Sequence, residues 1–469
     1  MCTGASTSVD RGPDAAPSLP SGLARRSVKP VHVNTSRKKY AFVGLGHRAG
    51  VFVDAIVGKY SDRSELVGLC DTNRTRMNYY NRRFHKEFGA RPVTTYLADR
   101  FDSMVREQRP DVVFVTTIDR THHEYIIRAM ELGCDVITEK PMTIDAEKCR
   151  AIFDAIQRTG RKLRVAFNYR YAPARTTVKD LLMKGTIGVV KAVHFEWLLD
   201  TRHGADYFRR WHRDKRNSGG LMVHKATHHF DLVNWWLDSS PQTVFGLGAL
   251  AFYGRANAEA RGDYRAYQRS TGSPQAEGDP FALDLRKDDR LRALYLDAEH
   301  EDGYFRDQNV FGDGITTEDT MNVLVRYRSG AQMSYSLTAY CPWEGCRVAF
   351  TGARGRIEFE DVETIEGGQT STIVGESGTP GQRIIVFPHW KKPYHAEIPP
   401  AVGGHGGGDV VLAEALFGNP PPDPYHRAAS HIDGARSILT GIAANISFAT
   451  GAPVEVDRLF ALPDPAPSS

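Results

Sequence analysis

The stretch Tyr40-Ala41-Phe42-Val43-Gly44-Leu45-Gly46-His47-Arg48-Ala49-Gly50 decides the fold of this chain. A short apolar run passes into the pattern G-x-G-x-x-A and then into an amphipathic segment, which predicts a strand, a tight turn and a helix. Gly44 permits the sharp turn, Gly46 lets backbone N–H groups come close to a ligand, and Ala49 lets the helix pack closely on the strand. The stretch predicts the phosphate-binding start of a dinucleotide fold, with a purely structural turn as the alternative.

A second apolar run, residues 65–70, ends in Asp71. Dinucleotide folds place an acid on the adenosine ribose at about this distance beyond the glycines, so Asp71 favours NAD. Arg74 lies three residues further on. It leaves NADP open, because a nearby arginine can take a 2′-phosphate.

Strand and helix patterns alternate along the next hundred residues, so we expect a parallel, doubly wound sheet. Ligands of such sheets gather beyond the carboxyl ends of the strands. In this sequence those ends are Gly44, Asp71, Thr116-Thr117 and Glu139-Lys140-Pro141. A lysine at the tip of a buried strand projects into the cleft, although a solvated loop lysine before a helix-initiating proline is the alternative.

A glycine-led segment, residues 218–237, carries histidines on a helical apolar pattern. His224 and His228 are four residues apart and are therefore expected on one helix face. Zinc binding is disfavoured, because the Glu of an H-E-x-x-H site is missing. A structural histidine pair and a proton-transfer face toward the cofactor cleft are the other two interpretations.

Alternating patterns begin near Val189 and predict a second domain with a largely antiparallel sheet. Residues 253–317 form a long polar stretch that interrupts these strands, and we expect a lid, an oligomer arm or a capping subdomain there. The sequence predicts four segments: a flexible tail at 1–37, a Rossmann domain at 38–170, a substrate and oligomerisation domain at 171–460, and a tail at 461–469.

The composition is that of an ordinary soluble protein, with 41% hydrophobic and 25% charged residues in 469. Its 60 basic and 56 acidic residues are scattered, which argues against nucleic acid as a partner. No apolar run is long enough to span a bilayer, so we expect no membrane partner. Six cysteines are few for this length and favour a reducing cytoplasm.

With these three signals in this order, the chain resembles the Gfo/Idh/MocA family of nicotinamide-dependent oxidoreductases, which act mainly on sugars and cyclitols. The motifs that carry the resemblance are G-x-G-x-x-A at 44–49, Glu139-Lys140-Pro141 and the histidine segment at 219–232. The resemblance implies a Rossmann domain followed by an α/β domain with a large open sheet, which often serves to form dimers or tetramers. It also implies that Lys140 orients the reacting hydroxyl and that His228 moves its proton.

These arguments give three groups of site residues. The catalytic residues are Lys140, His228 and His224. The residues expected to bind NAD, or NADP, are Gly44, Gly46, His47, Arg48, Ala49, Asp71, Thr116, Thr117, His122, Glu139 and Lys140. The residues expected to bind a small carbohydrate are Lys140, Tyr169, Arg170, Trp211, His212, Arg213, His224, Lys225 and His228. We expect no metal ion.

One position departs from the family pattern. Family members commonly carry an aspartate four residues before the catalytic histidine, where this chain has His224 followed by Lys225. A histidine cannot supply a fixed negative charge beside Lys140, so we expect a different electrostatic balance, with Lys140, Lys225, Arg170 and Arg213 close together. Such a pocket suits a neutral His224 or an anionic substrate.

Three functions are compatible with the sequence. The first is an NAD(P)-dependent dehydrogenase acting on a secondary hydroxyl of a sugar, glycoside or cyclitol. The alternative is a glycoside hydrolase that holds NAD and works by transient oxidation and elimination, with His224 as a base for the carbon proton. The third is a non-catalytic nucleotide-binding protein, since fold likeness does not by itself establish catalysis.

Overall fold

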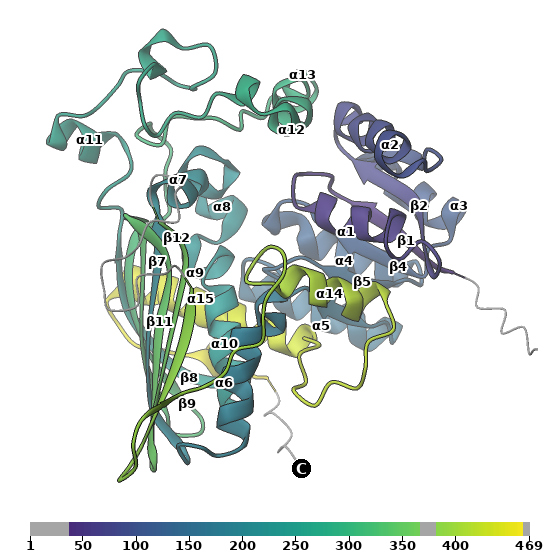
Figure 1. The fold of residues 1–469 in the computed structure, drawn as a ribbon. Coiled ribbons are helices and arrows are strands. Elements are labelled where there is room, and N and C mark those ends of the chain that lie inside the picture. Colours follow the sequence, from purple (N-terminus) through teal and green to yellow (C-terminus); the bar gives the residue numbers. More distant parts are fainter. Residues whose placement is uncertain (1–36, 366–380, 463–469) are drawn as a thin grey trace, which may run out of the picture. The chain divides into compact units, whose positions relative to one another are not determined.

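Six parallel strands form the first sheet, in the order β3-β2-β1-β4-β5-β6 (Figure 1). The computed structural model describes residues 37–365 and 381–462, so the predicted tails lie almost wholly outside the described residues. The strand order runs outward in both directions from β1, which confirms the doubly wound sheet. The strands are β1 (Lys38–Val43), β2 (Ser64–Asp71), β3 (Thr94–Leu97), β4 (Val112–Val115), β5 (Asp135–Thr138) and β6 (Leu163–Val165).

Helices connect these strands and cover both faces of the sheet. They are α1 (Ala49–Val57), α2 (Arg74–Phe88), α3 (Phe101–Gln108), α4 (His122–Glu131) and α5 (Ala146–Thr159). On the α1 side, Phe42 of β1 stacks on Phe114 of β4 with ring centroids 4.8 Å apart, and Phe52 of α1 lies 4.4 Å from Phe114. Phe417, from α14 (Gly408–Phe417) near the end of the chain, joins this aromatic cluster. A segment more than 350 residues from β1 in sequence therefore completes the core beneath the glycine turn.

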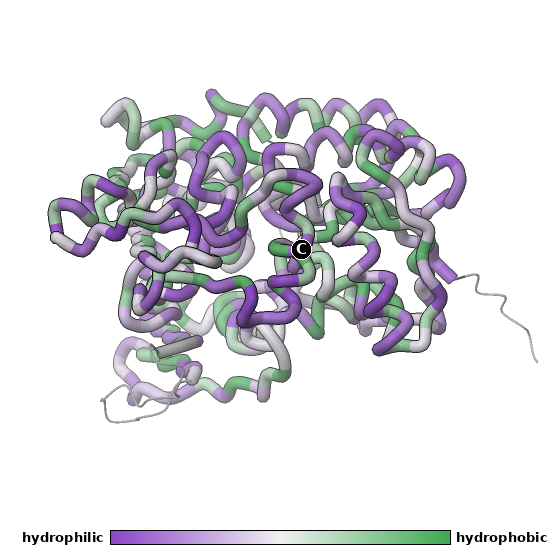
Figure 2. The backbone as a smooth tube through the Cα atoms, turned by 90° about the horizontal axis from the view of Figure 1, so that it is seen from above, coloured by the Kyte–Doolittle hydropathy of each residue, from purple (hydrophilic) through white to green (hydrophobic). Residues whose placement is uncertain are grey.

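A second sheet of nine strands follows, in the order β14-β13-β12-β11-β7-β10-β9-β8-β15. Its pairings are antiparallel except for β7 with β10, which run parallel. Figure 2 shows hydrophobic and hydrophilic stretches alternating along the backbone tube, as amphipathic elements require. The strands are β7 (Val190–Asp200), β8 (Pro241–Ala249), β9 (Thr320–Tyr327), β10 (Gln332–Cys341), β11 (Trp343–Gly352), β12 (Gly355–Ile365), β13 (Gln382–Pro388), β14 (Tyr394–His395) and β15 (Val454–Glu455).

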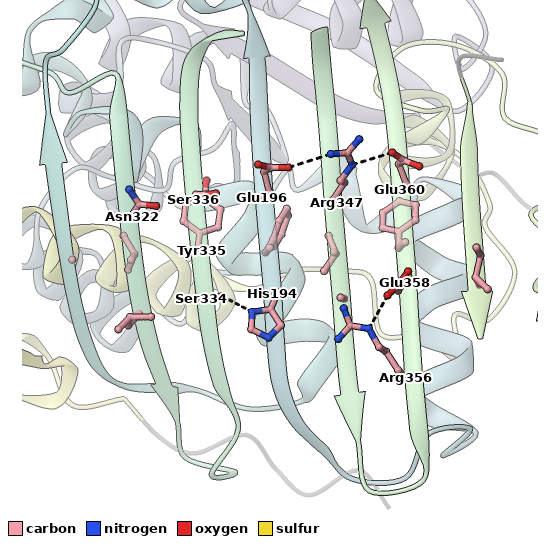
Figure 3. A pocket seen from close by; sticks show the side chains of 18 of the residues that line it. His194, Glu196, Asn322, Ser334, Tyr335, Ser336, Arg347, Arg356, Glu358 and Glu360 are labelled. Carbon is pink, nitrogen blue, oxygen red and sulfur yellow. Dashed lines mark hydrogen bonds and ion pairs between the residues drawn. The ribbon is translucent and has the colours of Figure 1, made fainter. Parts of the chain in front are cut away.

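One face of the second sheet is covered by helices and the other is open. The remaining helices are α6 (Pro173–Met183), α7 (Thr201–Arg209), α8 (Lys215–Ser218), α9 (Leu221–His224), α10 (Thr227–Leu237), α11 (Arg255–Arg261), α12 (Asp289–Leu291), α13 (Glu299–Asp302), α15 (His431–Thr450) and α16 (Val456–Leu459). On the open face, polar side chains pair across the strands, as Arg347 does with Glu360 and Arg356 with Glu358 (Figure 3). Leu247 and Leu324, 64% and 55% exposed, help to line a hollow of about 670 Å³ there.

One segment differs from the sequence prediction. The histidine segment is not one helix: α9 ends at His224 and α10 begins at Thr227, so His224 and His228 lie on separate helices. The last long helix, α15, begins at His431. Ser430 caps it, because its side chain accepts the N–H groups of Ile432 and Asp433 while Asp433 accepts the Ser430 N–H.

The polar stretch 253–317 forms short helices and turns that reach the first domain. Leu285, Leu294 and Tyr295 are buried in the same apolar cluster as Phe42 and Phe52. Figure 1 draws α12 and α13 of this stretch beside α2. We refer to residues 285–304 as the strap. Sequence patterns could not place it, because its contacts with the first domain join residues more than 200 positions apart.

Within residues 37–365 and 381–462, no helix combines the length and the apolarity that crossing a membrane requires. Over the same residues, no group of three or more His, Cys, Asp or Glu side chains is placed to hold a metal ion.

Candidate active site

The glycine turn has the geometry that close approach to a ligand requires. Gly44 has φ +86°, and a Cβ on it would lie 2.6 Å from the backbone N of Thr117, so only glycine fits. Around Gly46, a Cβ would meet only the hydroxyl of Tyr295 within 4 Å. Helix α1 starts directly after the turn, with no side-chain cap and no acid in its first turn among the described residues. The positive end of a helix dipole suits an anion such as a pyrophosphate, so the glycine turn and the uncapped start of α1 fit a dinucleotide.

Asp71 lies at the carboxyl end of β2, beside this turn. Its carboxylate accepts the N–H of Leu45 at 2.5 Å and the N–H of Asn73 at 2.9 Å. Burial raises the pKa of Asp71, against the pull of the nearby Arg76 guanidinium. The acid is therefore fixed beside the glycine turn, and its contact with a ribose stays a prediction.

Several predicted cofactor residues tie neighbouring strand ends together. Arg48 donates to Glu139 at 2.6 Å and to Asp409 at 2.9 Å, which joins the glycine turn to the end of β5 and to α14. His122 contacts the carbonyl oxygens of Pro141 and Thr117, at 2.8 and 3.1 Å. Thr116 donates its hydroxyl to the Gly44 carbonyl.

His47, the exposed residue of the turn, contacts the strap. Its backbone N–H donates to the Tyr295 hydroxyl at 3.0 Å, and Arg290 donates to its carbonyl. Partial desolvation of the imidazole ring, followed by the charges of Arg290 and Arg306, lowers the pKa of His47 to about 4. The glycine turn is thus bordered by cations, which favours a negatively charged ligand.

Lys140, His224 and Asp119 form a continuous polar line. The Lys140 amine donates to the His224 carbonyl at 3.1 Å and lies 3.4 Å from the His224 Nε2. The other ring nitrogen, Nδ1, is 2.5 Å from an Asp119 carboxylate oxygen. A neutral imidazole that donates from Nδ1 to Asp119 therefore presents a lone pair on Nε2 to the Lys140 ammonium.

The pKa values of these groups follow mainly from their burial. Burial lowers the pKa of Lys140 to about 8, although the carboxylates Glu139 and Asp119 act in the opposite direction. Burial and the charge of Lys140 lower the pKa of His224 well below its ordinary value. Burial raises the pKa of Asp119 well above its ordinary value. His224 is therefore neutral at pH 7, in line with the neutral form considered from the sequence.

Asp119 corrects the expectation that this site lacks a carboxylate near Lys140. It lies in a 3-10 turn, Asp119–Thr121, just beyond the carboxyl end of β4, and it reaches Lys140 through His224. Asp119 is not among the site residues predicted from the sequence. An acid two residues beyond Thr117 at a strand end was the available signal.

His228 lies in the first turn of α10 and is 5% exposed. Its ring stacks on Tyr169 with centroids 4.1 Å apart and planes 14° apart. Its Nδ1 is buried without a hydrogen-bond partner among the described residues. Burial, followed by the charges of Lys140 and Lys225, lowers the pKa of His228 well below its ordinary value. Lys140 and His228 are therefore within electrostatic range of each other.

Tyr169 packs on the His228 ring, and Lys225 and Arg175 contact Tyr169 in turn. The Arg175 guanidinium lies 4.0 Å from the centroid of the Tyr169 ring, and Lys225 donates to the Tyr169 hydroxyl at 3.2 Å. Both Tyr169 and Lys225 are buried, at 1% and 3% exposure. These contacts fix the plane of the His228 ring.

Of the cations expected near Lys140, Lys225 acts on its pKa, whereas Arg170 and Arg213 have partners elsewhere. Arg170 is bonded to Asp231 at 2.6 Å and to Asp433 at 3.0 Å, because its guanidinium is buried and needs carboxylate partners. Arg213 donates to Gln308 and to the Asp313 carbonyl, which fastens the polar stretch. A contact of these two arginines with substrate stays a prediction.

Trp211 and His212 lie beside His224. The two rings stack with centroids 3.5 Å apart, and the His212 ring meets the His224 ring edge to face at 4.2 Å. Burial and nearby cations lower the pKa of His212 well below its ordinary value. The short 3-10 turn Trp211–Arg213 thus brings two of the predicted substrate residues next to His224.

Two family models match this chain. Residues 38–167 match the model of the oxidoreductase family's NAD-binding Rossmann fold, and residues 179–456 match that of its C-terminal alpha/beta domain. YteT of Bacillus subtilis (strain 168), which is classed as an oxidoreductase without a stated substrate, is 35% identical over 438 residues, covering 90% of this chain and 99% of its own length.

Two more distant relatives carry more specific descriptions. The inositol 2-dehydrogenase of Rhizobium meliloti (strain 1021) is 31% identical over 140 residues, which cover 30% of this chain and 40% of that protein. An oxidoreductase from Agrobacterium radiobacter, solved in complex with NAD+, L-tartaric acid and magnesium, shares the fold with a TM-score of 0.58 at 15% identity, over 91% of this chain and 100% of that one. The chain therefore belongs to the Gfo/Idh/MocA oxidoreductase family.

Proposed function

We propose that this oxidoreductase transfers a hydride between NAD and a secondary hydroxyl of a cyclitol or sugar. The observation that carries the proposal is the polar line Asp119–His224–Lys140 beside a neutral His228, at the carboxyl edge of a dinucleotide-binding sheet. The inositol 2-dehydrogenase likeness supports a cyclitol, and the fold admits other sugars.

His228 acts as the general base. Its depressed pKa keeps it unprotonated at pH 7, so it can take the hydroxyl proton as the carbon is oxidised. Tyr169 stacks on its ring and holds its plane, so the accepting nitrogen keeps one direction. In the reverse reaction the same nitrogen returns the proton. NAD, when bound, accepts the hydride.

Lys140 holds the substrate oxygen and stabilises the negative charge that develops on it. The His224 carbonyl and Nε2 already orient the ammonium, which leaves a third N–H for the substrate. Asp119 fixes the His224 tautomer, so Nε2 faces Lys140 as an acceptor. His224 is in this account a substrate contact or an accessory proton carrier.

The proposal is tested by following nicotinamide absorbance with NAD+ and a panel of inositols, aldoses and glycosides. We expect NADH to accumulate with at least one free cyclitol or sugar. Cleavage of a glycoside without net NADH would instead support the redox-dependent hydrolase. Binding of NAD+ with no turnover of any compound would support the non-catalytic alternative.

The pH profile of kcat/KM should have an alkaline limb, set by Lys140, and an acid limb, set by His228. Lys140 must be charged, and its pKa is lowered to about 8, so kcat/KM should fall as pH rises through about 8. His228 must be neutral, and its pKa lies well below 6.5, so the acid limb should lie below the ordinary histidine range. The Lys140→Arg variant should keep its charge and lose the alkaline limb. An alkaline limb that is unmoved in this variant would contradict the assignment.

Asp119→Asn should lower kcat by about 10- to 100-fold, the worth of a buried hydrogen bond to a charged group. The asparagine amide can donate to the His224 Nδ1 and force the other tautomer, which turns an N–H toward the Lys140 ammonium. Steady-state kinetics measures the effect, with the exposed Asp62→Asn as control. Unchanged kcat would show that Asp119 has no part in the reaction.

We also propose that the protein is a dimer or tetramer in the cytoplasm. The open face of the second sheet, with exposed Leu247 and Leu324 in its hollow, supports association through this surface (Figure 3). The five cysteines in the described residues are free thiols, which supports a reducing compartment. Sedimentation velocity would contradict the first point with a purely monomeric species, and cell fractionation tests the second.

A further inference from the structure

The strap contacts the start of α2 through a carboxylate. Glu301 of α13 accepts the backbone N–H of Arg74 at 2.7 Å and the backbone N–H of Thr75 at 2.8 Å. These N–H groups open the helix that follows β2 and Asp71. Glu301 thus fills the first turn of α2 with a negative charge that comes from 226 to 227 residues away in sequence.

Three further contacts hold α13 in this position. Asn73, which is fully buried, donates its side-chain amide to the Ala298 carbonyl at 2.7 Å. Arg76 pairs with Asp302 at 2.6 Å and donates to the Leu294 carbonyl at 3.0 Å. Because buried polar groups at the start of α2 have partners in the strap, these contacts hold α13 against α2. Figure 1 shows α13 beside α2.

The position of Glu301 at the start of α2 affects whether NAD or NADP can bind. A dinucleotide fold places the adenosine ribose at the acid that ends the second strand, here Asp71. NADP differs from NAD by a 2′-phosphate on that ribose, which binds donors in the following turn. Here these backbone donors are taken by Glu301, and two more carboxylates, Asp71 and Asp302, lie around Arg76.

We propose that Glu301 is a specificity-determining residue, which excludes the 2′-phosphate and makes this enzyme select NAD over NADP. The inference rests on the proposed function only in taking a nicotinamide dinucleotide as the ligand. A phosphate dianion would have to displace the Glu301 carboxylate or lie against it at close range, and like charges at such a distance repel strongly. Asp71 alone could still accept the hydroxyls of an unmodified ribose.

Arg74 offers the competing possibility, which is a preference for NADP. Its side chain is exposed and lines a hollow of about 380 Å³ together with Asn78 and Arg100. Two guanidinium groups could hold a 2′-phosphate there. The two possibilities predict opposite preferences between the nucleotides, so binding measurements decide between them.

The test measures dissociation constants of NAD+ and NADP+ for the full chain by isothermal titration calorimetry, without substrate. The variants are Glu301→Gln, which keeps the shape and removes the charge, and Glu301→Ala. Asp297→Asn is the matched control, because Asp297 is an exposed strap acid that pairs with Arg292. Arg74→Ala tests the competing hollow.

We expect the wild-type chain to bind NAD+ at least about tenfold more tightly than NADP+. Both Glu301 variants should reduce this ratio by about tenfold or more, and raised salt should reduce it in the wild type. Asp297→Asn should leave it unchanged. A ratio that the Glu301 variants do not change, or an NADP+ preference that Arg74→Ala removes, overturns the inference alone. Failure to bind either nucleotide overturns the proposed function as well.

Discussion

Replacing His228 by alanine should lower kcat by about 10²- to 10⁴-fold, the usual contribution of a positioned general base. His228 is neutral at pH 7 because burial and the charges of Lys140 and Lys225 lower its pKa. Alanine removes the only part of this side chain that can accept the hydroxyl proton, while the stack on Tyr169 contributes packing alone. The affinity for NAD+ should be unchanged, since His228 is not among the residues of the glycine turn.

Single-turnover absorbance at saturating NAD+ and substrate measures this effect separately from product release. The control is His300→Ala, a histidine of α13 with 69% of its side chain exposed. His228→Asn is a second variant, because it keeps polarity and part of the stack without a base. If His228→Ala retains wild-type kcat while the protein stays folded by circular dichroism, His228 is not the base.

Lys140→Ala should lower kcat by about 10²- to 10³-fold, the cost of removing one preorganised donor to a developing oxyanion. The loss should appear in kcat more than in KM, because the ammonium interacts most strongly with the charged oxygen of the transition state. The variant also removes a donor to the His224 carbonyl, so His224 loses part of its orientation.

Steady-state kinetics with Lys140→Arg beside Lys140→Ala separates charge from shape. Arginine should restore part of the rate, because it keeps a cation but not the compact geometry of an amine. Lys59→Ala is the control, since Lys59 is exposed and pairs with Glu414 at the surface. Equal losses in the Arg and Ala variants would show that charge stabilisation is not what Lys140 supplies.

The glycine turn and the first sheet could be predicted because their signals are local. Gly44 is required by a positive φ and by the nearness of Thr117, and the apolar runs of β1 and β4 show burial on both faces. The same holds for Lys140 and His228, which were identified through short motifs. Their roles in catalysis stay predictions until the variants are assayed.

The remaining features depend on contacts that no local pattern records. Asp119 meets His224 across 105 residues, and Glu301 meets α2 across more than 220. The break between α9 and α10 could not be predicted, because Lys225 and Ala226 have ordinary helical propensity. At the break the Ala226 N–H donates to the Leu221 carbonyl, five residues back. The arginines Arg170 and Arg213 could be recognised as cations from the sequence, but not as already paired.

A crystal structure of the full chain with NAD+ and a turned-over cyclitol or sugar tests the central claim most directly. The account predicts the pyrophosphate at Gly44–Ala49, with the reacting hydroxyl within hydrogen-bond reach of both the Lys140 amine and a ring nitrogen of His228. A substrate hydroxyl bound elsewhere, with Lys140 and His228 both remote from it, would contradict the account.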